Sequence, residues 1–203
     1  MTTLTSLPPP GRAQSVGRVD TVANLVTVVR TVLAVALGAY ALVERSGSLL
    51  LIAYGVYWLG DMLDGWSARR LAQQTRLGAV LDIVSDRACC AVLCCGLLAL
   101  SPELWPAVAL FLLQFMVVDC VLSLSFLCWS IDSPNDFHVV DRQVWRLNWS
   151  PVAKAVNTTG VVAAVATGSL ELAVTVALGQ LALKVWSSAA VLRLLERPEP
   201  SAP

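Results

Sequence analysis

Four aspartates stand at helical spacing within a strongly apolar part of the chain. Asp61 and Asp64 are three residues apart, and Asp82 and Asp86 are four residues apart. Residues at these separations lie on one face of an α-helix, so each pair presents its carboxylates to one side. An acid at the centre of a bilayer costs about 3 kcal/mol, which makes such residues candidates for function.

The two aspartate pairs are expected to face each other. Residues 70–76 form a short connection, which makes the two predicted helices antiparallel neighbours. At a rise of about 1.5 Å per residue, Asp61, Asp82 and Asp86 lie roughly 12, 9 and 15 Å from the same membrane surface. Converging carboxylates cannot all stay ionised without compensation. Two divalent cations would cancel their charge, and hard oxygen ligands favour Mg²⁺ or Mn²⁺.

Charge and spacing leave more than one chemistry open. A pair of metals suits displacement at phosphorus, because it clamps the phosphate oxygens and the leaving group. The same acids could instead line a proton or ion pathway, or pair with Arg69, Arg76 and Arg87. We favour the metal–phosphate site and keep a non-enzymatic metal-binding or ion-transport protein as the alternative.

The composition indicates a membrane protein. Of 203 residues, 57% are hydrophobic and 14% are charged, whereas soluble domains have about 45–50% apolar and 25% charged residues. These proportions exclude a disordered chain and argue against an ordinary water-soluble enzyme. The formal net charge is zero, so no nucleic-acid partner is expected.

Apolar runs predict an all-α, polytopic membrane fold with six transmembrane helices. We place them at residues 22–43, 49–68, 77–100, 105–129, 151–168 and 170–195. Each is near the roughly 20 residues that cross a bilayer, the fifth being short. Residues 1–20 are expected to be a tail and juxtamembrane segment with a short surface helix. Residues 21–197 hold the six-helix domain, and residues 198–203 are a C-terminal tail.

Basic residues gather at one end of these predicted helices. They are Arg12, Arg18, Arg69, Arg70, Arg76, Arg142, Arg146, Lys154, Arg193 and Arg197. The positive-inside rule then predicts a multi-pass cell-membrane protein with both termini in the cytoplasm. Residues 130–150 would form the main cytoplasmic loop, in which His138 is a loop residue and Trp129, Trp145 and Trp149 suit the membrane interface.

Three further charges lie within predicted spans. Asp119 and Lys184 are at similar depths, roughly 15 and 13 Å, so we expect an ion pair or two walls of an acceptor cavity. Arg30 lies about 12 Å into the first helix and is expected to face donor phosphates or an acid. The cysteines at 89, 90, 94 and 95 are expected to be reduced apolar packing residues.

The aspartates belong to a longer pattern. It reads Asp61-Met-Leu-Asp64-Gly65-Trp-Ser-Ala68-Arg69, eight residues, Gly78, three residues, Asp82, three residues, Asp86. This pattern resembles the signature of the CDP-alcohol phosphotransferase (phosphatidyltransferase) family at all eight fixed positions. Asn24, Thr27 and Arg30 resemble the looser pattern of the family's first helix.

The resemblance implies a six-helix homodimeric enzyme with two divalent metals. Such enzymes transfer a phosphoalcohol unit from a CDP-linked donor, usually CDP-diacylglycerol in small members, to an alcohol with release of CMP. It implies that Asp61, Asp64 and Asp82 are metal ligands and that Asp86 is the general base, also near the second metal.

On the donor side, the resemblance places Gly65 and Ala68 against the cytidine and Arg69 at the phosphates. Gly78 and Arg30 are further candidates for donor binding. Close helix packing is another role open to both glycines.

The pattern leaves the acceptor undefined. Residues 115–126 carry no arginine, whereas the inositol-phosphate and glycerol-phosphate branches usually carry arginines there, and the phosphatidylserine pattern is also missing. Lys154, followed by Thr158, is similar to a Lys-plus-Thr feature of several phospholipid synthases, cardiolipin synthases included. Lys154 either holds an acceptor phosphate or marks a helix start, and Asp119 is the other acceptor candidate. A catalytically silent family member is a further alternative.

Overall fold

The computed structural model describes residues 17–196, except for the side chains of residues 158–165. Within this part of the chain the structure is helical and contains no strand. The α-helices are α1 (Val22–Glu44), α2 (Gly47–Arg70), α3 (Arg76–Leu100), α4 (Trp105–Leu112), α5 (Cys120–Leu124), α6 (Arg142–Asn148), α7 (Pro151–Ala166) and α8 (Leu170–Leu195). The predicted all-α class is therefore confirmed.

Hydroxyl side chains cap the N-termini of the first three helices. Thr21, Ser46 and Thr75 cap α1, α2 and α3, each accepting a hydrogen bond from a backbone N–H three residues later. Such caps satisfy N–H groups that a helix leaves unpaired. Arg45 adopts a left-handed conformation between α1 and α2, which lets the chain reverse at once. These three helices consequently form a tight antiparallel unit.

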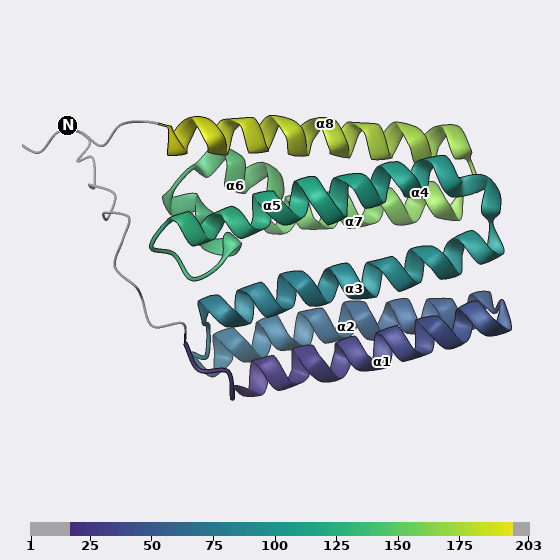
Figure 1. Ribbon diagram of the computed structural model, residues 1–203, viewed down its shortest axis with the longest axis horizontal. Helices are drawn as coiled ribbons and strands as arrows, with labels where there is room; N and C mark the ends of the chain where they lie inside the picture. Colours follow the sequence, from purple (N-terminus) through teal and green to yellow (C-terminus); the bar gives the residue numbers. More distant parts are fainter. Residues whose placement is uncertain (1–16, 197–203) are drawn as a thin grey trace, which may run out of the picture.

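The helices form two groups that lie side by side (Figure 1). One group holds α1, α2 and α3, with α1 packed on both of the others. The other holds α4 to α8, in which α8 packs against α4 and α7. The start of α1, the α2–α3 connection, α6 and the end of α8 lie at one end of the molecule (Figure 1). The segments expected in the cytoplasm therefore share one end.

Four helical segments in the described part are long and apolar enough to cross a membrane. They are Val22–Glu44, Arg76–Leu100, Pro102–Cys128 and Leu170–Leu195. The third runs through α4, a π-helical segment (Leu113–Asp119), α5 and a 3₁₀ segment (Ser125–Cys128). Helix α2 carries two acids and two terminal arginines, and α7 has only 16 residues. Their bounds lie close to those predicted for the second and fifth spans, but neither is among the four apolar segments, so six spans remain a prediction.

The segment predicted as a cytoplasmic loop is more structured than expected. Residues 130–150 contain a 3₁₀ segment (Pro134–Val139) and α6. Phe137, Val144 and Trp149 are buried there in an apolar cluster that includes Phe126 of the fourth span. The interface position predicted for Trp149 is wrong, because this side chain packs against Phe137 instead. His138 is exposed beside Trp145.

The described residues stop short of both predicted tails. The short surface helix expected within residues 1–20 is not present in residues 17–20, and residues 1–16 lie outside the described residues. The predicted C-terminal tail, residues 198–203, also lies outside them. All six cysteines are free. Of the four predicted to be packing residues, Cys89 and Cys94 are buried, Cys90 is half-buried and Cys95 is exposed.

Candidate active site

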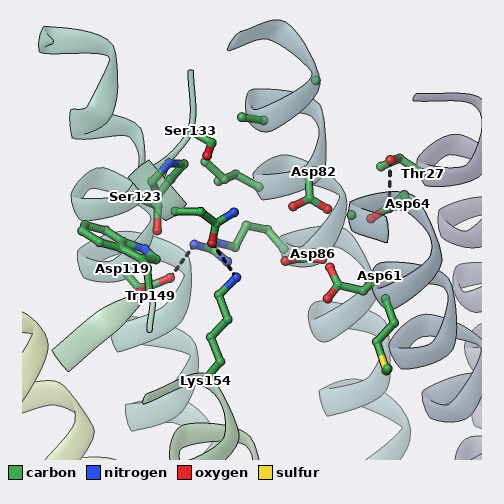
Figure 2. Close-up of a pocket in the computed structure, with 18 of the residues that line it drawn as sticks. Thr27, Asp61, Asp64, Asp82, Asp86, Asp119, Ser123, Ser133, Trp149 and Lys154 are labelled. Carbon is green, nitrogen blue, oxygen red and sulfur yellow. Dashed lines mark hydrogen bonds and ion pairs between the residues drawn. The ribbon is translucent and has the colours of Figure 1, made fainter. Parts of the chain in front are cut away.

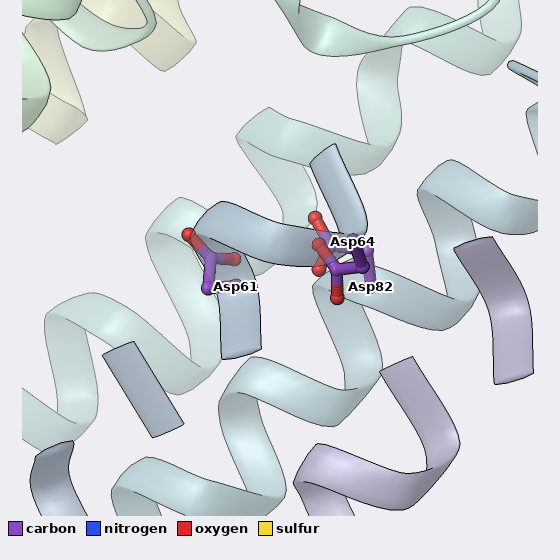
Figure 3. Close-up of side chains that lie close together, drawn as sticks. All are labelled: Asp61, Asp64 and Asp82. Carbon is purple, nitrogen blue, oxygen red and sulfur yellow. The ribbon is translucent and has the colours of Figure 1, made fainter. Parts of the chain in front are cut away.

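Helices α2 and α3 bring the four aspartates together. Oxygen atoms of Asp61, Asp64 and Asp82 all lie within 4.8 Å of one another, and Figure 3 shows the three side chains. Asp86 lies one turn further along α3 and shares a partner with them. The convergence predicted from helical spacing is thus present in the structure.

That shared partner is Arg30 of α1. Its Nε lies 2.6 Å from Asp64, and its Nη2 lies 2.5 Å from Asp82, 3.1 Å from Asp86 and 3.5 Å from Asp61. The Arg30 side chain is only 2% exposed. The prediction that Arg30 faces an acid is confirmed, and a single guanidinium holds all four carboxylates.

Small and polar neighbours make room for Arg30. A Cβ atom placed on Gly60 would lie 2.7 Å from Arg30 Cδ, so only glycine lets the arginine stem pass over α2. The Arg30 guanidinium also lies over the Tyr57 ring, 5.6 Å from its centroid. Thr27, one turn before Arg30, donates a 2.9 Å hydrogen bond to Asp64. Sequence reasoning missed Gly60 and Tyr57, although both stand one turn or less before Asp61.

The carboxylate cluster fits a divalent cation. Four aspartates and Arg30 leave a formal charge of minus three. Asp61 and Asp82 keep 43% and 40% of their side chains exposed, so their oxygens remain accessible to a ligand. Hard, closely spaced oxygens are what Mg²⁺ and Mn²⁺ require. Asp61, Asp64 and Asp82 offer oxygens close enough to one another to hold one ion, with Asp86 beside them.

A cavity of about 870 Å³ opens between the two helix groups, and the carboxylates line it. A volume of this order suits substrates of drug size or larger. Other predicted site residues also line it, namely Gly65, Ala68, Arg69, Gly78, Lys154 and Asp119. Arg30 is not among the lining residues and lies behind the carboxylates. The structure therefore brings the donor and acceptor candidates to one chamber.

The glycines of the donor side differ in what they contact. A Cβ on Gly65 would lie 3.3 Å from Nη1 of Arg69, whose guanidinium folds back over that glycine. A Cβ on Gly78 would lie 2.8 Å from Oδ1 of Asn24, at the start of α1. Gly78 thus allows close helix packing, while Gly65 lies next to a cation on the cavity wall.

Across the cavity from the carboxylate cluster, Asp119 forms ion pairs with two basic side chains. Lys184 Nζ and Arg87 Nη2 each lie 2.6 Å from a different Asp119 oxygen. The predicted Asp119–Lys184 pair is confirmed, and Arg87 is a partner of Asp119 that the sequence reasoning missed. Matching the depths of Arg87 and Asp119 could have found it. Lys154 reaches into the cavity between the two sides, where it donates to Asn135 Oδ1 at 2.8 Å (Figure 2).

Comparison with known proteins agrees with this geometry. The family model for CDP-alcohol phosphatidyltransferase matches residues 20–192. A CDP-diacylglycerol–inositol 3-phosphatidyltransferase of Schizosaccharomyces pombe is 46% identical over 52 residues, 26% of this chain and 22% of that protein. The protein of the same name from Candida albicans is 45% identical over 53 residues, 26% of this chain and 23% of its own length.

The aligned part thus spans less than a quarter of either curated relative. No solved structure matches the chain at a significant level. The family model, in contrast, covers nearly the whole helical region, including both aspartate pairs. Four apolar helices of spanning length fit the same conclusion. The chain therefore belongs to the CDP-alcohol phosphatidyltransferase family and is a transferase.

Proposed function

We propose that this protein transfers the phosphatidyl group of CDP-diacylglycerol to a hydroxyl of inositol, releasing CMP. The observation that carries the proposal is the cluster of four carboxylates around Arg30, on the wall of a cavity of about 870 Å³. The two similar proteins named for CDP-diacylglycerol and inositol suggest both substrates.

Asp86 is the residue placed to take the acceptor's proton. The acceptor oxygen attacks the β-phosphorus, and the bond from that phosphorus to the CMP oxygen breaks. The hydroxyl proton passes to Asp86, and the negative charge leaves on CMP. A positioned base of this kind contributes about 10²–10⁴-fold to the rate.

Two ions of Mg²⁺ or Mn²⁺ would be held by Asp61, Asp64 and Asp82, with Asp86 at the edge of this group. Bound there, such ions would neutralise charge on the phosphates and the leaving group. Arg30 binds the carboxylates from behind and fixes their positions. Its buried Nη1 has no hydrogen-bond partner among the described residues, which leaves two N–H donors for rearrangement when the substrates bind.

The donor is expected to lie along α2 and the start of α3. Gly65 and Ala68 leave room for the cytidine, and Gly78 keeps the two helices close. Arg69, next to Gly65, is placed to bind the diphosphate through charge-assisted hydrogen bonds. Arg30 adds positive charge behind the same site.

We assign the protein to the cell membrane as a six-span homodimer with both termini in the cytoplasm. Helices α2 and α7 then cross the bilayer with the four apolar segments, and Asp61 and Asp64 of α2 and Lys154 of α7 line the cavity. The basic end of the bundle faces the cytoplasm, and a water-soluble acceptor reaches the cavity from there. Lys154 and Asp119 are the acceptor candidates on the far wall.

The test is CMP release by the purified protein with CDP-diacylglycerol, Mg²⁺ and a panel of alcohols. We expect release that depends on inositol and on the divalent ion, and that is lost in Asp61→Asn. The matched control is Asp132→Asn, which changes a cavity-lining acid outside the cluster. A folded wild-type protein that releases no CMP with any alcohol would instead support a silent family member. Movement of ions across a membrane that holds the protein, without CMP release, would support a transport protein.

A further inference from the structure

A second polar cluster lines the cavity on the side away from the carboxylates. Asp119 lies between Arg87 and Lys184, with both ion pairs at 2.6 Å and all three side chains at most 11% exposed. Figure 2 shows Asp119 and Ser123 on the opposite side of the view from Asp61, Asp64 and Asp82. Charged side chains at such depth in a spanning helix are costly, so they usually mark a substrate path.

The cluster is held rigidly. The Arg87 guanidinium stacks over the Phe115 ring, 3.8 Å from its centroid, while its Nη2 binds Asp119. Phe115 and Asp119 belong to the π-helical segment Leu113–Asp119. Such segments are rare and frequently stand at functional sites, because the extra residue redirects side chains. The local distortion thus turns several polar groups toward one cavity.

This cluster retains unused hydrogen-bonding groups. Gln114 is 3% exposed, lines the cavity, and its Oε1 has no hydrogen-bond partner within the described residues. Arg87 Nε is buried and likewise unpaired there. Lys184 has three N–H donors, of which one is directed at Asp119. Buried polar groups are nearly always satisfied, so an accepting and donating ligand is expected at this place.

We propose that this cluster binds the acceptor's hydroxyl groups and selects an uncharged polyol over a phosphorylated alcohol. The inference rests on the proposed transfer to inositol and adds to it the residues that recognise the acceptor. A hydroxyl donates one hydrogen bond and accepts others. Gln114 Oε1 offers the acceptor, while Arg87 and Lys184 offer donors.

Charge explains the selection against phosphate. Asp119 already binds both cations, one on each of its oxygens. A phosphate placed here would compete with that carboxylate for Arg87 and Lys184. Like-charge contact of this kind excludes wrong ligands as effectively as good contacts select right ones.

Gln114→Leu tests the hydroxyl contact. The substitution removes the unpaired oxygen at similar volume, so thermal stability should stay equal or rise. The KM for inositol should rise about tenfold, the effect of one lost hydrogen bond, while CDP binding is unchanged. Val117→Ala, in the same π-helical segment but 53% exposed, is the control and should keep the wild-type KM.

Asp119→Asn tests the selection. The amide removes the negative charge that pairs with Arg87 and Lys184, so a phosphate can bind both of them. The ratio of kcat/KM for inositol to kcat/KM for glycerol 3-phosphate should therefore fall at least about tenfold. Should this variant not fold, Gln114→Leu alone decides. An unchanged inositol KM in Gln114→Leu overturns the acceptor site, and so does a wild-type preference for glycerol 3-phosphate. In both of those cases the wild-type protein still releases CMP with inositol, whereas failure of the proposed function leaves it without inositol-dependent release.

Discussion

Gly60 is the position where a single methyl group should damage the carboxylate cluster. In Gly60→Ala the new Cβ would lie 2.7 Å from Arg30 Cδ and 3.1 Å from Arg30 Cγ. Carbon atoms in contact prefer about 3.5–4.0 Å, so the arginine stem has to move by roughly 1 Å. The contacts of Arg30 to Asp64 and Asp82, at 2.6 and 2.5 Å, would not survive such a shift.

Two opposing effects set the size of the change. Overpacking in a tight interior costs about 1–3 kcal/mol, whereas replacing a helical glycine by alanine gains about 1 kcal/mol. Gly55, on the same helix, has no atom within 4 Å of a Cβ placed there. Gly55→Ala therefore has only the gain, and the two variants should differ in unfolding free energy by about 1–3 kcal/mol.

Gly60→Ala and Gly55→Ala should differ more in catalytic activity than in stability. Misplacing catalytic groups by about 1 Å can cost 10²-fold in rate, so Gly60→Ala should lose about that factor in CMP release. Gly55→Ala should stay within about twofold of the wild type, as expected for a substitution that contacts nothing. Equal activity and equal thermal stability in the two variants would refute the account of how Arg30 is held.

Three further predictions concern the base, the segment before α7 and the topology. Asp86→Asn should cut turnover by about 10²–10⁴ and weaken CDP-diacylglycerol binding less than Asp61→Asn; equal binding losses, both restored by high Mg²⁺, would make Asp86 mainly a ligand. Phe137 is fully buried, so Phe137→Ala should lower the unfolding free energy by about 3–5 kcal/mol. Val139 is exposed on the same segment, so Val139→Ala should leave the unfolding free energy unchanged. Equal losses of unfolding free energy in the two variants would contradict the packing described. Reporter fusions at the C-terminus and after Arg76 should both lie in the cytoplasm, since an outward Arg76 would deny a cytoplasmic donor access to the site.

The sequence predicts the long helices and the acidic site well, for physical reasons. Long apolar runs can only become helices in lipid, and the observed α1, α3 and α8 begin and end within a residue of the predicted positions. The aspartate pairs depend on local spacing within single helices, which the 3.6-residue period determines. Arg30 was predicted to meet an acid because its depth matched theirs.

What the sequence left out depends on contacts between distant segments. Helix α6 has seven residues, too few to give a periodic signal. It is stabilised by burial of Val144 and by packing of its surroundings on the fourth span. The π-helical segment and the Arg87–Asp119 pair likewise arise from how α3, the fourth span and α8 meet. No local sequence pattern predicts these contacts between helices. The Asp119–Lys184 pair could be predicted only because the two residues lie at similar depths in their spans.

The central claim is that the carboxylates around Arg30 form a site for two divalent cations. The most direct measurement is the number of Mn²⁺ ions bound per chain, by electron paramagnetic resonance, at saturating CDP-diacylglycerol. We expect two ions for the wild-type protein and for Asp132→Asn, and fewer than two for Asp82→Asn. Equal Mn²⁺ binding by Asp82→Asn and the wild-type protein, or no bound Mn²⁺ in either, would contradict it.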